Sequence, residues 1–211
     1  MKLYVEGGGD AKSLQIECRR GFREFLEKAG LKGKMPGITA CGGRRQAYDD
    51  YRVALKSGES AALLVDSEAP VVLEHQQPED QFLKWQPWRH LKARHGDDWD
   101  KPANALDTDC HLMVQIMESW FLADRDAIKA FFGQDFNENA LPSADRPIES
   151  LAKNDVYDAL RRATQNCKTK AKYGKGEHSF KLLAKIDPAK VVAASPWAQR
   201  FVEELKKKMG V

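Results

Sequence analysis

The sequence predicts an α/β fold in which a mostly parallel sheet is flanked by helices. Short apolar segments of strand length alternate with amphipathic segments of helix length over residues 1–66, in the order strand, helix, strand, helix, strand. This alternation is typical of parallel strands joined by right-handed crossovers. The chain has 211 residues, of which 42% are hydrophobic and 31% charged, so it is long enough and apolar enough to bury a core.

The first strand is predicted over residues 3–5 and ends at Glu6. The glycine run 7–9 follows as a turn whose backbone can approach a ligand closely. It matches neither the P-loop pattern nor the dinucleotide-binding fingerprint. A helix capped by Asp10 or Ser13 then runs to Gly30, because its apolar residues form one stripe at steps of three and four: Leu14, Cys18, Phe22, Phe25 and Ala29.

A second strand is predicted over residues 37–41, and the Gly-Gly turn after it opens a helix that ends before Gly58. Arg44 and Arg45 stand at the start of this helix, where free backbone N–H groups can hold a phosphate. A solvent-exposed first turn explains the same residues equally well. The third strand, over residues 61–65, ends at Asp66 and is followed by Glu68.

Residues 69–109 interrupt this alternation and are interpreted as an insertion packed over the sheet edge near the carboxylates. Four prolines punctuate the segment, and only residues 88–95 have a helical pattern. Its histidines lack the spacing of metal ligands. A fourth strand is predicted over residues 110–117, ending at Glu118, followed by a helix with a break near Asp124 that stops at Gly133. Residues 1–133 therefore form the predicted α/β core.

Residues 134–211 are predicted to form a helical C-terminal extension packed on this core. Helices are expected around 156–165, over 179–186, and over Pro188–Ala194 and Pro196–Met209 with Asp187 and Ser195 as caps. Segment 161–181 holds seven Lys or Arg residues and one acidic residue. We predict that this basic segment borders the acidic cluster and contacts a phosphate backbone through Lys170 and Lys172, although an ordinary solvated face would have the same composition.

Three carboxylates follow the ends of two predicted strands: Glu6, Asp66 and Glu68. The carboxyl ends of parallel strands form the ligand-binding edge of an open sheet, so these side chains are expected to converge there. Packed carboxylates repel one another unless a cation such as Mg²⁺ or Mn²⁺ lies between them. Such a site suits phosphoryl transfer. The alternative is that each residue is only a strand-end turn residue or a helix cap.

Composition excludes several classes of protein. The formal net charge of +3 is too small to indicate nucleic-acid binding without a local basic patch. The four cysteines are far apart, which matches neither a zinc site nor a disulfide framework. No apolar run reaches membrane-spanning length and no signal peptide is recognisable, so a cytoplasmic protein without a membrane partner is expected. Whether the chain forms a homo-oligomer is left open.

The two strand-end motifs, Val-Glu-Gly at 5–7 and Leu-Val-Asp-Ser-Glu at 64–68, resemble the two signatures of the Toprim domain of topoisomerases, bacterial primases and OLD-type nucleases. More closely, the chain resembles a bacterial Toprim-like family of unknown function. This second resemblance also rests on segments 115–124, 172–175 and 186–190. The Toprim fold is a Rossmann-like sheet, in agreement with the alternation of strands and helices.

The resemblance implies roles for individual residues. Glu6 would be the acid/base or metal carboxylate, and Asp66 and Glu68 the metal pair, although the usual pair is Asp-x-Asp and Glu68 departs from it. Glu118 would be an accessory metal ligand. Lys175 or His178 would contact the phosphate or the transition state.

We therefore expect a Mg²⁺-dependent nuclease that acts on nucleic acid, with DNA favoured. Relatives of this kind imply a separate ATPase partner and a role in defence against phage or foreign DNA, and the chain has no Walker motif of its own. One alternative is a non-catalytic Toprim-like module that binds a partner protein or nucleic acid. Another is a nucleotidyl transferase or phosphatase that acts on a small phosphate.

Overall fold

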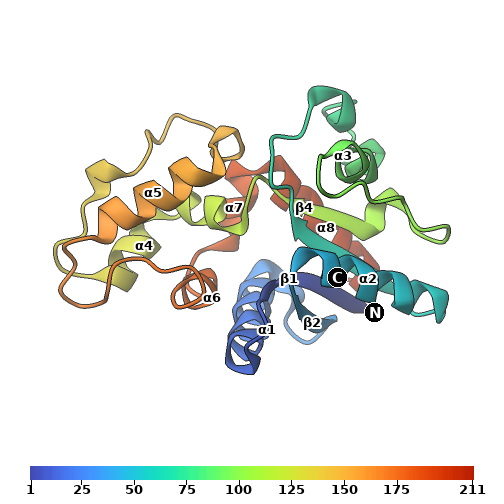
Figure 1. The fold of residues 1–211 in the computed structure, drawn as a ribbon, viewed down its shortest axis with the longest axis horizontal. Helices are drawn as coiled ribbons and strands as arrows, with labels where there is room; N and C mark the ends of the chain where they lie inside the picture. The colour runs from blue at the N-terminus through green and yellow to red at the C-terminus, as the bar shows by residue number, and fades with distance from the viewer.

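In the computed structural model, which describes residues 1–211, four parallel strands form one sheet in the order β2-β1-β3-β4 (Figure 1). The strands are β1 (Lys2–Gly8), β2 (Gly37–Gly42), β3 (Ala61–Asp66) and β4 (Cys110–Met113). Helices flank the sheet, so the predicted α/β class is confirmed. The central strand β1 pairs with β2 on one side and with β3 on the other, where Val5 lies opposite Leu64.

The two faces of the sheet bury separate hydrophobic clusters, because alternate residues of a strand point to opposite sides. Leu3 and Val5 pack against helix α1 (Lys12–Leu26), whereas Tyr4 packs against helix α2 (Arg44–Lys56). Helix α1 has no side-chain cap, so the predicted cap at Asp10 or Ser13 is wrong. It continues to Leu31 as a π-helical turn. The two crossovers therefore cover opposite faces of the sheet.

The insertion 69–109 covers the α2 face of the sheet rather than only its edge. Its one α-helix is α3 (Pro87–Ala93), near the predicted position. Three buried tryptophans anchor the segment to the cluster on this face, and the ring of Trp99 stacks on that of Tyr48 with centroids 4.6 Å apart. The other two are Trp85 and Trp88.

The fourth strand is shorter than predicted. Its pairing with β3 ends where Met113 lies opposite Asp66, and a 3-10 helix begins at Met117. The prediction of a strand over residues 110–117 is therefore wrong, and Glu118 lies in the first turn of the 3-10 helix rather than at a strand end. Val114, Ile116 and Met117 are buried in the core without extending the sheet, which explains why this segment has a strand-like composition. The predicted break at Asp124 is confirmed, since its side chain caps helix α4 (Arg125–Phe132).

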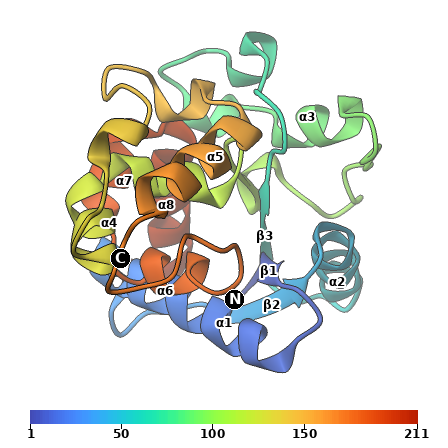
Figure 2. The ribbon, with the colours of Figure 1, turned by 60° about the vertical axis from the view of Figure 1, so that its left-hand side comes forward.

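Four helices follow in the C-terminal third: α5 (Lys153–Thr164), α6 (Ser179–Leu183), α7 (Pro188–Ala194) and α8 (Pro196–Met209). The side chains of Asp187 and Ser195 cap α7 and α8, as predicted. Helix α8 packs on β4 and α6 packs on α1, so these helices share the hydrophobic cluster on the α1 face. Figure 2 shows the strands between the C-terminal helices on one side and α2 and α3 on the other. None of the helices combines the length and apolarity needed to cross a membrane.

Candidate metal centre

The strand order places a crevice between the carboxyl ends of β1 and β3. The chain leaves β1 toward β2 on one side, and leaves β3 toward β4 on the other. In open parallel sheets, ligands bind at such a reversal of strand order. Glu6 projects from β1 into this crevice, Asp66 is the last residue of β3, and Glu68 follows two residues later. The structure thus brings together the three carboxylates that the sequence singled out.

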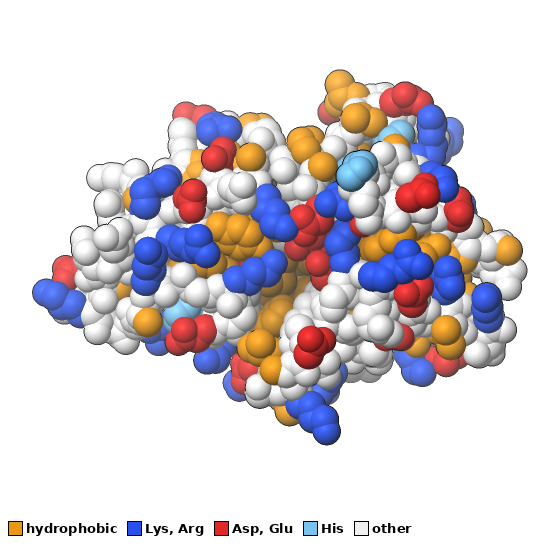
Figure 3. Space-filling model, in the orientation of Figure 1, with side chains coloured by type: hydrophobic (Ala, Val, Ile, Leu, Met, Phe, Trp, Pro, Cys, Tyr) orange, Lys and Arg blue, Asp and Glu red, His pale blue; other side chains and the backbone are white.

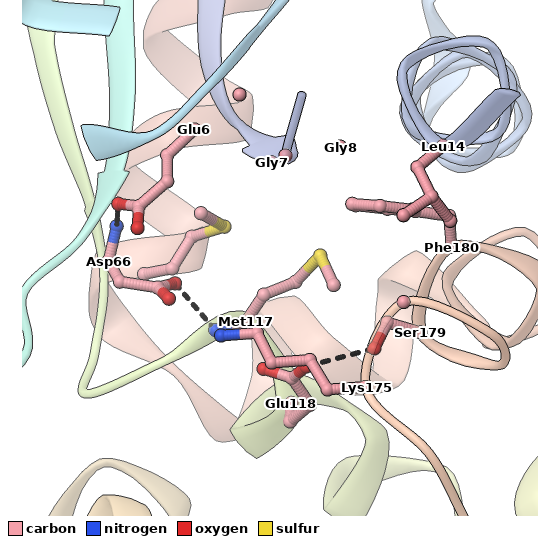
Figure 4. A pocket seen from close by; sticks show the side chains of 14 residues that line it. Glu6, Gly7, Gly8, Leu14, Asp66, Met117, Glu118, Lys175, Ser179 and Phe180 are labelled. Carbon is pink, nitrogen blue, oxygen red and sulfur yellow. Dashed lines mark hydrogen bonds between the residues drawn. The ribbon is translucent and has the colours of Figure 1, made fainter. Parts of the chain in front are cut away.

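Each of the three carboxylates offers an oxygen, and these oxygens lie within 4.8 Å of one another. The backbone N–H of Asp66 donates to Oε2 of Glu6 over 3.0 Å, and the N–H of Met117 donates to Oδ1 of Asp66 over 2.8 Å (Figure 4). Asp66 is only 4% exposed, yet its Oδ2 has no hydrogen-bond donor in the protein. One acceptor of a nearly buried carboxylate therefore remains available to a ligand.

Two basic side chains already contact the outer carboxylates. The Nη1 of Arg44 lies 3.4 Å from Oε2 of Glu6 and also donates to the backbone carbonyl of Asp66. The same guanidinium forms a two-pronged pair with Asp97 at 3.1 and 2.6 Å. Lys153 lies 2.5 Å from Oε2 of Glu68. Arg44, predicted to contact a phosphate, is therefore held by protein carboxylates.

The environment raises the pKa of the carboxyl groups of Glu6 and Asp66. Burial is the main cause for Glu6, assisted by Glu68 and opposed by Arg44 and by the backbone N–H of Asp66. Burial also raises the pKa of Asp66 well above its ordinary value, and the nearby carboxylates of Glu6 and Glu118 add to this. Ionising both groups is thus costly without a further positive charge. Two adjacent, desolvated carboxylates with a third at their edge are a donor set that fits a hard divalent cation.

A cavity of about 210 Å³ opens beside the carboxylates. Glu6 and Asp66 line one side of it, and Lys175 lies at its edge. The ammonium of Lys175 rests 5.3 Å from the ring centroid of Tyr157 and has no ion-pair partner. Burial lowers the pKa of Lys175, but Glu118, Tyr157 and Asp66 outweigh this and raise it overall, so the side chain remains cationic. The structure thus brings Lys175 to the predicted site.

Glu118 also lines the cavity, but protein hydroxyls already bond to both of its oxygens. It is 1% exposed, and its Oε1 accepts hydrogen bonds from the hydroxyls of Tyr173 at 3.1 Å and Ser179 at 3.0 Å. The hydroxyl of Tyr157 donates to Oε2 over 3.3 Å. Glu118 is not one of the three clustered carboxylates. The implied role of Glu118 as an accessory metal ligand stays a prediction: it lies outside the cluster of three, hydroxyls bond to its oxygens, and its position was misjudged with the length of β4.

The residues predicted to contact nucleic acid do not gather in one place. His178 is buried against the rings of Phe131, Phe132 and Tyr173, and its Nδ1 accepts the N–H of Gly174 over 3.0 Å. It is a core residue, so its predicted ligand contact is wrong.

The basic residues of this group lie on the surface. Arg45 pairs with Asp49 on the exposed side of α2. Lys170 lies over the ring of Phe131, and Lys172 is exposed. Figure 3 shows acidic side chains near the centre of this face with Lys and Arg side chains around them. Among the lysines and arginines of segment 161–181, Lys175 is the one that lines the cavity.

Four partners of the site were not predicted: Asp97, Lys153, Tyr157 and Tyr173. Asp97 comes from the insertion and the other three from the C-terminal third, so no local pattern connects them to the strand ends. The only available signal was the Lys-Tyr-Gly-Lys segment at 172–175, which contains Tyr173 next to the predicted Lys175.

Comparisons with known proteins identify a family that covers nearly the whole chain. No curated protein and no solved structure matches the chain. A family model described as a domain of unknown function, DUF4276, matches residues 5–206, which include every carboxylate and basic residue of the site. The chain therefore belongs to the DUF4276 family.

Proposed function

We propose that the protein is a Mg²⁺- or Mn²⁺-dependent phosphodiesterase that cleaves nucleic acid, a nuclease of the Toprim type. The observation that carries this proposal is the cluster of Glu6, Asp66 and Glu68 at the crevice between β1 and β3, with one oxygen of the nearly buried Asp66 free. The order of the motifs that hold these residues, which resembles Toprim proteins, supports the same function.

In this proposal the three carboxylates hold the ion. The chemistry that a divalent ion supplies in such a site is neutralisation of the phosphate and activation of a water molecule. Arg44 and Lys153 fix the orientation of Glu6 and Glu68 from outside the cluster. Because both basic side chains remain attached to the outer oxygens, the carboxylates are oriented before a ligand arrives.

Lys175 contacts the phosphate of the substrate. Its charge is maintained by the acidic surroundings, and it has no protein carboxylate to neutralise it directly. Glu118 is a positioning residue for it, since Glu118 binds the hydroxyls of Tyr173 and Ser179, which lie on either side of Lys175 in the chain. The loop that carries Lys175 is therefore tied at both ends to one buried carboxylate.

The substrate is nucleic acid, with DNA favoured, and the chain works with a separate ATPase in defence against phage or foreign DNA. These two points are supported by the resemblance to OLD-type nucleases, and the surface arginines and lysines around the acidic centre support a polyanionic substrate (Figure 3).

The test is cleavage of labelled DNA and RNA by the purified chain in Mn²⁺ or Mg²⁺, with and without a chelator. Asp66→Asn keeps the shape of the side chain and removes its charge, so it should abolish cleavage. Asp155→Asn, the same change at an exposed position of α5, is the matched control and should cleave normally. A wild-type chain that cleaves no nucleic acid, alone and with the neighbouring ATPase supplied, would refute the proposal.

A non-catalytic module is the second candidate function, and one observation favours it. Arg44 and Lys153 already neutralise Glu6 and Glu68, so two of the three carboxylates have protein cations as partners. A scaffold of this kind would bind a protein or nucleic acid without a divalent ion. Titration with Mn²⁺ followed by electron paramagnetic resonance separates the two functions. A scaffold that binds no ion would give only the spectrum of free Mn²⁺, whereas the nuclease would reduce the free signal as it binds the ion.

A further inference from the structure

The cavity beside the carboxylates has two chemically different sides (Figure 4). Glu6, Asp66, Glu118 and Lys175 form the charged side. Leu14 of α1 and Phe180 of α6 form an apolar wall across from Glu6 and Asp66, whereas Met113 and Met117 line the cavity next to Asp66. With a divalent ion on the carboxylates, a ligand that fills this cavity carries an anionic group at the charged side and an apolar group at the wall.

Glycine backbone forms the rim between the two sides. A Cβ atom on Gly7 would lie 2.8 Å from Cζ of Phe180, and one on Gly42 would lie 2.7 Å from the carbonyl oxygen of Gly9. Both glycines also have positive φ, at +141° and +77°. Side chains are thus excluded from the rim, and a ligand can approach the backbone directly.

The size of the cavity limits its occupant to one ring-sized group. Its volume of about 210 Å³ is below the range of roughly 300–1,000 Å³ typical of sites for drug-sized ligands. A space of this size is matched to a single nucleoside rather than to two stacked bases, with the phosphate toward the carboxylates and Lys175. Charge selects the phosphate end, because Lys175 and an ion held by the carboxylates are the positive groups there.

We propose that this cavity takes one unpaired nucleotide of a nucleic acid chain, with its nucleoside against Leu14 and Phe180 and its phosphate between the carboxylate site and Lys175. The inference rests on the proposed nuclease function and specifies its substrate: single strands, overhangs and frayed ends rather than intact duplex. A base inside a duplex is stacked on both sides and paired, so it reaches an enclosed pocket only after being extruded, at a cost in free energy.

The inference is tested by binding, separately from cleavage. Fluorescence anisotropy of the full chain in Mn²⁺ compares a short single strand, a blunt hairpin duplex of the same sequence and a mononucleotide, with intactness checked afterwards on a gel. The single strand should bind about tenfold more tightly than the duplex, since contact of one base with a protein side chain contributes roughly that factor. The mononucleotide should bind more weakly than the strand.

Leu14→Trp fills the cavity and should abolish the preference for single strands. Ile16→Trp is the matched control, because Ile16 is on the same helix but is 56% exposed and lies outside the cavity. If Leu14→Trp does not fold, Leu14→Phe is a milder second variant. In each variant, unchanged Mn²⁺ binding would show that the carboxylate cluster is intact.

Four outcomes would overturn the inference. Duplex and single strand could bind equally, or the preference for single strands could survive in the filled variants. The mononucleotide could bind as tightly as the strand, or no nucleic acid could bind at all. A wild type that binds single strands selectively but cleaves nothing would refute the proposed nuclease and leave the cavity assignment standing.

Discussion

Two buried acidic residues, Asp66 and Glu118, line the same cavity and differ in how many hydrogen bonds they accept from the protein. Glu118 accepts hydrogen bonds from three hydroxyls and is 1% exposed. Asp66 is almost as buried but accepts one backbone N–H at Oδ1, and its other oxygen faces the cavity without a donor. Both oxygens of Glu118 accept hydrogen bonds, so this carboxylate stabilises the fold. One oxygen of Asp66 has no donor, so this carboxylate is available to a ligand.

The largest effect that this comparison predicts is a loss of stability in Glu118→Ala. The change removes the common acceptor of three hydroxyls, of which those of Tyr173 and Ser179 can still bond to each other, and each buried group left unsatisfied costs about 1–3 kcal/mol. We expect a destabilisation of about 3 kcal/mol or more, which lowers the melting temperature by about 6–12 °C for a chain of this size. Thermal unfolding followed by circular dichroism measures it.

Glu118→Gln, which keeps an acceptor oxygen, is the control, and its melting temperature should fall much less than that of Glu118→Ala. If Glu118→Ala melted at the wild-type temperature, the hydroxyl network would not be stabilising, and the contrast with Asp66 would disappear.

The second prediction concerns added metal. Mg²⁺ at about a hundred times its dissociation constant should stabilise the wild type by about 2.7 kcal/mol, because the ion binds only the folded chain. Asp66→Ala should lose this response while being at least as stable as the wild type without metal, since it removes one of several crowded like charges. Differential scanning calorimetry with and without Mg²⁺ measures both. A variant that unfolds at room temperature would instead identify Asp66 as a structural residue.

The third prediction concerns pH. Because the folded pKa values of Glu6 and Asp66 are raised, the folded chain holds more protons than the unfolded chain at pH values between the two sets of pKa. Their contribution to stability is therefore greatest below the unfolded values of about 4 and is lost as the pH rises toward the folded values. The difference in unfolding free energy between wild type and Asp66→Asn, measured in chelator, should grow in favour of the variant over this range. A difference that stays constant with pH would show that Asp66 ionises normally.

The smallest effect is expected for Lys153→Met. Lys153 and Glu68 are partly exposed, so breaking their pair should change stability by no more than about 1 kcal/mol. The released Glu68 loses the orientation that Lys153 gives it, and we expect Mn²⁺ to bind severalfold more weakly, as measured by isothermal titration calorimetry. Tighter binding would mean that Lys153 competes with the ion for Glu68 instead of orienting it.

The sequence was sufficient to predict that Glu6, Asp66 and Glu68 meet, and insufficient to place Glu118. Glu6, Asp66 and Glu68 follow strands whose apolar runs stop at the strand ends, so their meeting at one edge follows from parallel pairing. The mostly apolar segment before Glu118 continues past Met113, the last residue paired with β3, because Val114, Ile116 and Met117 pack in the hydrophobic core instead of in the sheet. Hydrophobicity reports burial and cannot by itself show where pairing ends.

The cationic partners were unpredictable for a different reason. Arg44 was identified as basic and close to the site, but its pairing with Asp97 depends on how the insertion folds back over α2. Lys153 meets Glu68 across 85 residues of chain, and nothing adjacent to either residue indicates the other. Local motifs predict which backbone positions face the site, whereas pairs between distant segments depend on the complete tertiary packing.

The pairing of Glu68 with Lys153 also has a consequence for synthesis. The three carboxylates leave the ribosome early, and Lys153, Tyr173 and Lys175 follow only in the last third of the chain. A nascent chain that has completed β3 but not α5 lacks the lysine that neutralises Glu68 and the loop that borders the cavity. The complete pocket thus forms only after the C-terminal third has docked, so a prematurely terminated product has the acidic strand ends but lacks Lys175 and Phe180.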